Sequence, residues 1–293
     1  MARQVTTEIF ESLYARLNHA QKEAVDAIEG PVMVVAGPGT GKTQVLTLRI
    51  ANILRLTDVE PKNILALTFT ESAAISMRRR LAEIVGSPAY SVVISTFHGF
   101  CNDIIKNYPE EFPRIVGSEH ITEVDQIAVV EDILRGAALV ELKPFGDPFY
   151  YLRSIAARIN TLKREGVDAG RFQEIVKEER KAFDALPEKL HGNGAHAGNM
   201  KGEFRRLLRK IEKNRELALV YAEYERRLAE SRRYDYNDMI MEVLRALERN
   251  ENLLLAFQEQ HQYLLVDEHQ DTNNAQNRIM ELLASFHENP NLF

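Results

Sequence analysis

A chain of 293 residues is long enough for about two domains, and its 45% hydrophobic and 27% charged residues are ordinary for a folded globular protein. The net charge of −6 excludes a uniformly basic coat for nucleic acid, so any contact with DNA or RNA has to be local. The lack of a long apolar run excludes a membrane partner, and a lone cysteine, Cys101, favours a reducing, cytoplasmic location.

Four short apolar runs predict buried parallel strands, in chain order at residues 31–36, 64–70, 91–97 and 263–268. Each run leads at once into polar or glycine-containing residues. Ligands of open α/β sheets bind beyond the carboxyl ends of the strands, so we expect the functional residues at these four ends.

The segment between the third and fourth runs predicts helices instead. Apolar residues recur there at helical spacing: Phe204, Leu207, Leu208, Ile211, Ala218, Tyr221 and Leu228. Residues 187–202 hold four glycines and predict a mobile loop. The sequence therefore predicts an α/β domain with a parallel sheet, formed by residues 1–113 and 234–293 and interrupted by an all-helical insertion at 114–233.

A glycine-rich loop follows the first run and precedes an apolar-periodic helix. Backbone N–H groups of such a loop surround a phosphate, and the helix N-terminus adds partial positive charge. Lys42 is expected to reach the β- and γ-phosphates, and the Thr43 hydroxyl to bind Mg²⁺. The predicted nucleotide-binding residues are Ala36, Gly37, Pro38, Gly39, Thr40, Gly41, Lys42 and Thr43, with Ala36 standing where the strict pattern has glycine.

An acidic stretch at the end of the fourth run is the predicted catalytic partner of this loop. Asp267 is expected to hold Mg²⁺, Glu268 to act as general base and Gln270 to sense the γ-phosphate. Taken alone, the stretch is more typical of a solvated acidic loop. The wide separation of Lys42 and Asp267 along the chain leaves room for the inserted helical domain.

Together these motifs resemble the N-terminal part of UvrD/Rep/PcrA-type superfamily 1 DNA helicases. Beside the phosphate loop and the acidic stretch, three further motifs carry the resemblance: LNHAQ at 17–21, LTFT with two alanines at 67–74, and STFHGF at 95–100. A weaker match is YDYNDMI at 234–240.

The resemblance implies a RecA-like domain that uses ATP and Mg²⁺ and couples ATP hydrolysis to 3′–5′ movement on DNA. It implies that Gln21 reads adenine and that Lys42, Asp267, Glu268 and Gln270 are catalytic residues. The implied partners are single-stranded DNA, single-strand/double-strand junctions and a second RecA-like domain whose arginines complete the ATP site. We expect a monomer.

The second and third strand ends are the predicted DNA contacts, through Phe69, Thr70, Thr96, Phe97 and His98. Hydroxyl groups there can hold a phosphate, and an aromatic ring can stack on a base without reading its identity. Core packing is an equally good interpretation of each phenylalanine.

Basic pairs between residues 201 and 235 are further candidate phosphate contacts or, alternatively, the solvated face of a helix: Arg205 and Arg206, Arg209 and Lys210, and Arg226 and Arg227. Three positions depart from the family pattern. Glu71-Ser72 replaces Asn-Lys, His269 replaces phenylalanine, and Gln44 stands where many members have arginine.

The sequence ends at Phe293, before the family's GDxxQ motif and second RecA-like domain. We therefore expect a chain that binds nucleotide, hydrolyses it slowly and does not unwind DNA by itself. Three alternatives stay open: the motor of a helicase–nuclease, a nucleotide-gated DNA-binding module without catalysis, and a phosphate-loop kinase or other NTPase that binds no nucleic acid.

Overall fold

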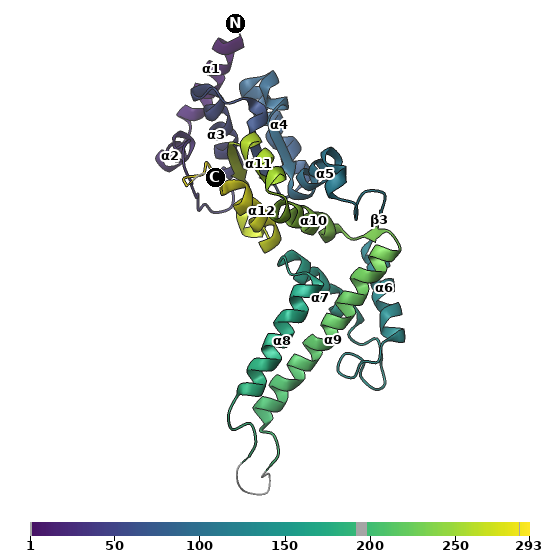
Figure 1. Cartoon of the computed structure of the whole chain (residues 1–293). Coiled ribbons are helices and arrows are strands. Elements are labelled where there is room, and N and C mark those ends of the chain that lie inside the picture. Colours follow the sequence, from purple (N-terminus) through teal and green to yellow (C-terminus); the bar gives the residue numbers. More distant parts are fainter. Residues whose placement is uncertain (1, 192–197, 287) are drawn as a thin grey trace. The chain divides into compact units, whose positions relative to one another are not determined.

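The computed structural model describes residues 2–191, 198–286 and 288–293, and its chain divides into two compact units (Figure 1). One unit comprises Met1–Phe112 and Glu242–Phe293, and the other comprises Pro113–Met241. The sequence predicts that the α/β domain resumes at residue 234. In the structure the division between the units falls later, inside a continuous helix, α10 (Tyr236–Arg249).

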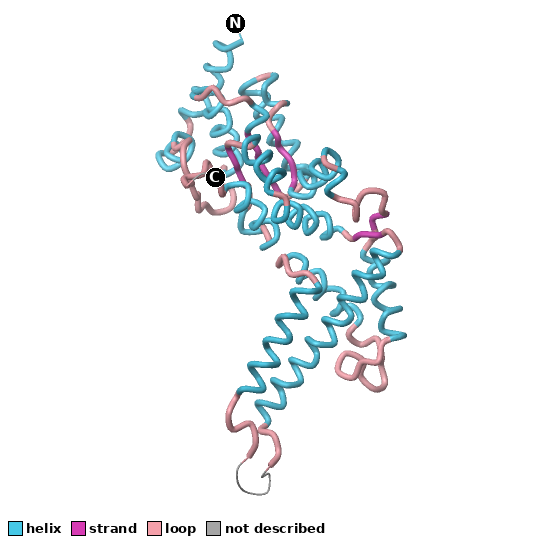
Figure 2. Tube along the Cα trace, in the orientation of Figure 1, coloured by secondary structure: helices cyan, strands magenta, loops and turns pink. Residues whose placement is uncertain are grey.

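The first unit is built on a parallel sheet, which confirms the predicted α/β class. Figure 2 shows its three strands side by side: β1 (Ile64–Thr68), β2 (Val93–Thr96) and β5 (Tyr263–Val266), in the order β2-β1-β5. Every residue of the central strand β1 is buried, as expected for a strand covered on both faces.

The predicted strand at residues 31–36 is wrong, because this run adopts no regular secondary structure. Residues 291–293 take the position beside β5, where the Leu264 and Val266 N–H groups donate to their carbonyls. The run meets this segment through the Val32 N–H, which donates to the Leu292 carbonyl at 2.8 Å. Its side chains stay outside the core, and Met33 is 82% exposed.

Helices surround this sheet, and two of them begin directly where a strand ends. Thr70 caps α4 and Thr96 caps α5, each hydroxyl accepting a hydrogen bond from a backbone N–H three residues on. None of the described helices combines the length and apolarity needed to cross a bilayer. The elements are α1 (Ala2–Ala15), α2 (His19–Asp26), α3 (Lys42–Leu56), α4 (Glu71–Val85), α5 (Phe97–Asn107), α11 (Glu251–Gln260), α12 (Asn274–Ala284), and the 3₁₀ turns η1 (Pro61–Asn63), η2 (Ser87–Tyr90), η3 (Pro109–Glu111) and η4 (His269–Asp271).

The second unit is helical apart from two very short parallel strands, β3 (Glu119–His120) and β4 (Arg233–Tyr234). Its helices are α6 (Glu123–Gly136), α7 (Leu152–Arg164), α8 (Ala169–Ala185) and α9 (Gly202–Glu230). Figure 1 shows α8 and α9 running side by side, and the predicted glycine loop joins them. Residues 192–197 of that loop lie outside the described residues.

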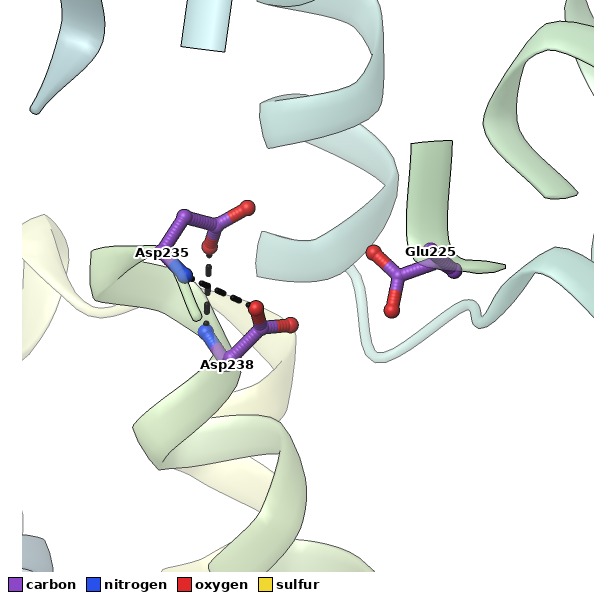
Figure 3. Close-up of side chains that lie close together, drawn as sticks. All are labelled: Glu225, Asp235 and Asp238. Carbon is purple, nitrogen blue, oxygen red and sulfur yellow. Dashed lines mark hydrogen bonds between the residues drawn. The ribbon is translucent and has the colours of Figure 1, made fainter. Parts of the chain in front are cut away.

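A buried ion-pair network holds the second unit together. Figure 3 shows three carboxylates of this network, from Glu225, Asp235 and Asp238. The Lys163 ammonium lies 2.5 Å from Asp235 and 2.7 Å from each of the other two. Burial opposes the charge of Lys163, but the carboxylates outweigh it and hold the pKa of the ammonium well above its ordinary value. The cation at the centre of these acids is therefore Lys163.

Candidate nucleotide site

The phosphate loop has the backbone that its glycines predict. Gly39 and Gly41 have φ of +74° and +81°, a left-handed conformation that glycine adopts without strain. The Thr40 hydroxyl donates to the Gly37 carbonyl at 2.8 Å and closes the loop. Gly41 is the N-cap of α3, so the partial positive charge of this helix end lies at the loop.

Lys42, the first residue of α3, reaches the end of β5. Its ammonium lies 3.6 Å from the Glu268 carboxylate and 3.5 Å from the Ala36 carbonyl. The Gln270 amide donates to the same Glu268 carboxylate. Folding thus brings together three of the predicted catalytic side chains from the two ends of the chain.

Asp267 and Thr43 form a pair of oxygen donors beside this lysine. The Thr43 hydroxyl lies 3.5 Å from Asp267 Oδ2, and the Asp267 N–H donates to the Leu67 carbonyl at the end of β1. Burial and then the negative charge of Glu268 raise the pKa of the Asp267 carboxyl. Hard oxygen donors beside excess negative charge fit Mg²⁺, which takes few protein ligands and keeps its phosphate and water ligands.

The backbone of Glu268 is strained. It has φ of +55° and ψ of +46°, the left-handed region that a residue with a side chain rarely adopts. Holding a non-glycine residue there costs about 1–3 kcal/mol, and such strain concentrates at functional sites. In this conformation the Glu268 carboxylate lies near Lys42 rather than away from the loop.

A cavity of about 480 Å³ opens at these side chains. Lys42, Asp267, Glu268 and Gln270 line one part of it, and His269 also contributes to the wall. Apolar residues form most of the remainder, among them Val32, Val34, Val45, Leu46, Met280 and Phe293. Among the described residues that line it, Lys42 is the only lysine or arginine.

Gln21 lies against the phosphate loop from the side of α2. Its side chain completes a capping box with Asn18, and its amide nitrogen donates to the Thr40 carbonyl at 2.9 Å. The first motif of the sequence is therefore in direct contact with the second.

The predicted DNA-contacting residues at the ends of β1 and β2 have different surroundings. Phe69 is 52% exposed, whereas Phe97 is 3% exposed and belongs to the core. A ring that is buried in this way presents no face to a base, so the core interpretation holds for Phe97 in this conformation. Thr70 is exposed, while Thr96 is buried and His98 is half-buried.

Glu71, one of the departures from the family pattern, connects these two strand ends. Its carboxylate accepts a hydrogen bond of 2.8 Å from the Thr96 hydroxyl. A Cβ atom on Gly99 would overlap the Ser95 hydroxyl and lie 3.1 Å from that of Thr96, so any other residue there would force the Ser95 side chain to move. No local pattern predicts the Glu71 contact, because its partner is 25 positions away.

Sequence reasoning also missed Arg49 and Asn52, which are buried on α3 and contact α2. The signal for them was the presence of Arg49 and Asn52, beside Thr47, within the otherwise apolar segment VLTLRIANIL.

One of the predicted basic pairs on α9, Arg226 and Arg227, is engaged in ion pairs within the second unit. Arg226 pairs with Glu223 and Glu230, and Arg227 pairs with Glu223 and Asp132. Hydrogen bonds from the two arginines lower the pKa of Glu223 to about 2. A phosphate would have to compete with these carboxylates, which favours the solvated-face interpretation at these positions.

Residues 17–293 match the family model described as "UvrD/REP helicase N-terminal domain". Two curated relatives, each described as "ATP-dependent DNA helicase PcrA", come from Staphylococcus aureus (strain Mu50) and Staphylococcus epidermidis (strain ATCC 12228). Each is 33% identical over 274 residues, a match that covers 94% of this chain and 32% of the relative. The chain thus spans about a third of the length of these relatives.

Proposed function

The chain belongs to the UvrD/REP helicase N-terminal domain family, and from this premise we propose that it is the ATP-binding part of an ATP-dependent 3′–5′ DNA helicase. The observation that carries the proposal is the meeting of Lys42, Asp267 and Glu268 at one cavity from opposite ends of the chain, with the Thr43 hydroxyl 3.5 Å from Asp267. A glycine-rich turn without this function has no need of a strained glutamate beside it.

The proposed roles follow from the positions of the side chains. Residues 36–43 bind the phosphates through backbone N–H groups and Lys42, and Gln21 contacts the adenine. Thr43 and Asp267 hold Mg²⁺, which when bound offsets the charge of the β- and γ-phosphates. Glu268 accepts a proton from the attacking water, and Gln270, hydrogen-bonded to it, orients this carboxylate.

Hydrolysis by this chain alone is proposed to be slow. Lys42 is the single lysine or arginine among the described residues lining the cavity, so little positive charge faces the transferring phosphoryl group. An added arginine is worth about 10³–10⁵ in rate in comparable sites. We infer that a second RecA-like domain of the whole protein supplies it and converts hydrolysis into movement.

Single-stranded DNA and its junctions with duplex are the proposed substrates of the whole protein. Phe69 has the exposure that base stacking needs, and Thr70 offers a hydroxyl beside it. Thr96 and His98 lie at the neighbouring strand end, and we propose that they shape the DNA-contacting surface there. The lone cysteine, buried Cys101, supports a cytoplasmic location, and we propose a monomer.

Calorimetric titration with Mg-ATP and a sensitive phosphate-release assay test the nucleotide site. We expect Lys42→Ala to lose binding, and Glu268→Gln to keep binding but lose at least about 100-fold in the residual hydrolysis rate. Glu248→Gln, a surface carboxylate that pairs with Arg278, is the matched control and leaves both unchanged. Unaltered hydrolysis in Glu268→Gln would instead favour a nucleotide-gated module without catalysis.

A further inference from the structure

We propose that Arg49 and Asn52, two buried side chains of α3, position Gln21 against the phosphate loop and so set the preference of the site for adenine. The inference deepens the proposed function and rests on it for ATP binding. Neither residue lines the nucleotide cavity, so both are positioning residues that act through the backbone of α2.

The starting observation is that α2 is short. It has 8 residues, which is below the about 12–15 residues that an isolated helix needs to be stable in water. Its position therefore depends on contacts with its neighbours. The last four carbonyls of any helix lack partners within the helix, and here they lie where α2 packs on α3.

The chain's own backbone satisfies two of these four carbonyls. The Ala27 N–H donates to the Glu23 carbonyl at 3.0 Å, and the Ile28 N–H donates to the Asp26 carbonyl at 2.8 Å. The carbonyls of Ala24 and Val25 remain for another partner.

Side chains of α3 satisfy those two. The Arg49 guanidinium donates to the Ala24 carbonyl at 2.7 Å and to the Ile28 carbonyl at 3.4 Å. The Asn52 amide donates to the Val25 carbonyl at 3.1 Å. Every terminal carbonyl of α2 thus has a partner, and the end of the helix is fixed to α3 by hydrogen bonds of defined direction.

Both side chains are buried, so water does not compete with the α2 carbonyls for their hydrogen bonds. Arg49 and Asn52 are each 1% exposed, and the Arg49 guanidinium lies over the ring of Phe293 at 4.5 Å. Burial lowers the pKa of Arg49 to about 10, so it keeps its charge at neutral pH. A buried cation is costly unless its hydrogen bonds compensate, and here the guanidinium donates to the carbonyls of Ala24, within α2, and of Ile28, just beyond it.

The other end of α2 carries the base-reading residue. Asn18 and Gln21 form the capping box, and the Gln21 amide donates to the Thr40 carbonyl. The same helix α3 begins with Lys42 and reaches Arg49 about two turns later. One rigid helix therefore fixes both the phosphate-binding lysine and, through α2, the glutamine.

The chemistry of Gln21 explains why its placement selects a base. In the described hydrogen bonds its amide uses one N–H, toward Thr40, and one acceptor position, toward the Asn18 N–H. A second N–H and a second acceptor position match the adjacent acceptor and donor of adenine, whereas guanine offers two acceptors at those positions. A shift of α2 would remove this match, and on the phosphate loop it would break only the Gln21 hydrogen bond to the Thr40 carbonyl among those described.

The test measures binding of three ligands to the 293-residue chain with Mg²⁺ by calorimetry: non-hydrolysable ATP, non-hydrolysable GTP and inorganic tripolyphosphate. In Arg49→Met we expect the ATP-to-GTP affinity ratio to fall about five- to tenfold, and tripolyphosphate affinity to stay within about twofold of wild type. Asn52→Leu removes one bond to the C-terminal end of α2, along with the bonds that Arg55 donates to Asn52, and lowers the ratio less. Arg49→Lys restores part of it.

Arg78→Met is the matched control, because Arg78 also donates to two backbone carbonyls, those of Val92 and Ile94, away from α2. It should keep the wild-type ratio. Gln21→Ala should abolish the preference for ATP over GTP. Arg49→Met added to Gln21→Ala should lower the ATP-to-GTP affinity ratio no further, since both changes act through the Gln21 side chain.

The proposal is overturned if folded Arg49→Met and Asn52→Leu keep the wild-type ratio, if tripolyphosphate affinity falls as much as ATP affinity, or if the double variant loses more than Gln21→Ala. Circular dichroism reports folding, and Asn52→Leu decides the matter if Arg49→Met does not fold. A wild-type chain that binds none of the three ligands would instead refute the proposed nucleotide site itself.

Discussion

At the scale of single residues, His261 makes the fold sensitive to acid. Its imidazole is 4% exposed, stacks on Phe257 and meets the edge of Phe100. Burial lowers the pKa of His261 to about 4, because the charged form would lose its water. The unfolded chain therefore binds a proton more readily than the folded chain does.

The direction of the pH dependence of stability follows from this difference in proton binding. The contribution of His261 to stability is fully present above its unfolded pKa near 6.5 and is lost as the pH falls through about 4. In the wild type, protonation of His261 should lower the free energy of unfolding by about 2–3 kcal/mol as the pH falls from 6.5 to 4. We expect His261→Phe, which keeps the ring packing, to abolish this decrease. Urea titration at each pH measures it. Exposed His19→Gln removes a histidine that is not buried and serves as the control.

At the scale of elements, the Lys163 network links α7, which carries the lysine, to α9 and to the start of α10. The network also explains why the division between the two units falls inside α10. Asp235 and Asp238 pair with Lys163 and so bind the first turn of this helix to the second unit. Lys163→Met would leave three carboxylates around an apolar side chain.

We expect Lys163→Met to lower the unfolding free energy by about 3–5 kcal/mol, because breaking a buried pair leaves uncompensated charge. Arg180→Met removes exposed pairs with Asp184 and Glu212 and should cost about 1 kcal/mol or less. Urea unfolding of both variants decides the point. Equal losses would mean that the buried network contributes no more than a surface pair.

Elements also show where sequence reasoning succeeds and where it stops. Residues 64–68 are recognisable as a strand because all are apolar or small and the polar strand end follows. Residues 31–36 give the same signal, yet their pairing depends on residues 291–293, which lie beside β5 and are remote in sequence. Local chemistry likewise predicted Lys42 and Glu268, whereas the contacts of Arg49 and Glu71 arise only through tertiary packing.

At the scale of the whole molecule, a net charge of −6 means that DNA is attracted only where the local charge allows it. The ends of β1 and β2 are the proposed place, and Glu71 puts a carboxylate between them. The family pattern has Asn-Lys where this chain has Glu71-Ser72. The acidic side chain should therefore weaken the attraction of phosphates to this surface.

We expect Glu71→Gln to raise the affinity for single-stranded DNA about fivefold at low salt, since its amide oxygen still accepts from Thr96 while the charge is gone. The gain should shrink as salt shortens the screening length to about 3 Å near 1 M. Fluorescence anisotropy with a labelled oligonucleotide measures both. Glu83→Gln, near the opposite end of α4, changes net charge equally and should gain little. Equal gains in the two variants would show that only net charge matters and that the ends of β1 and β2 are not the path of the strand.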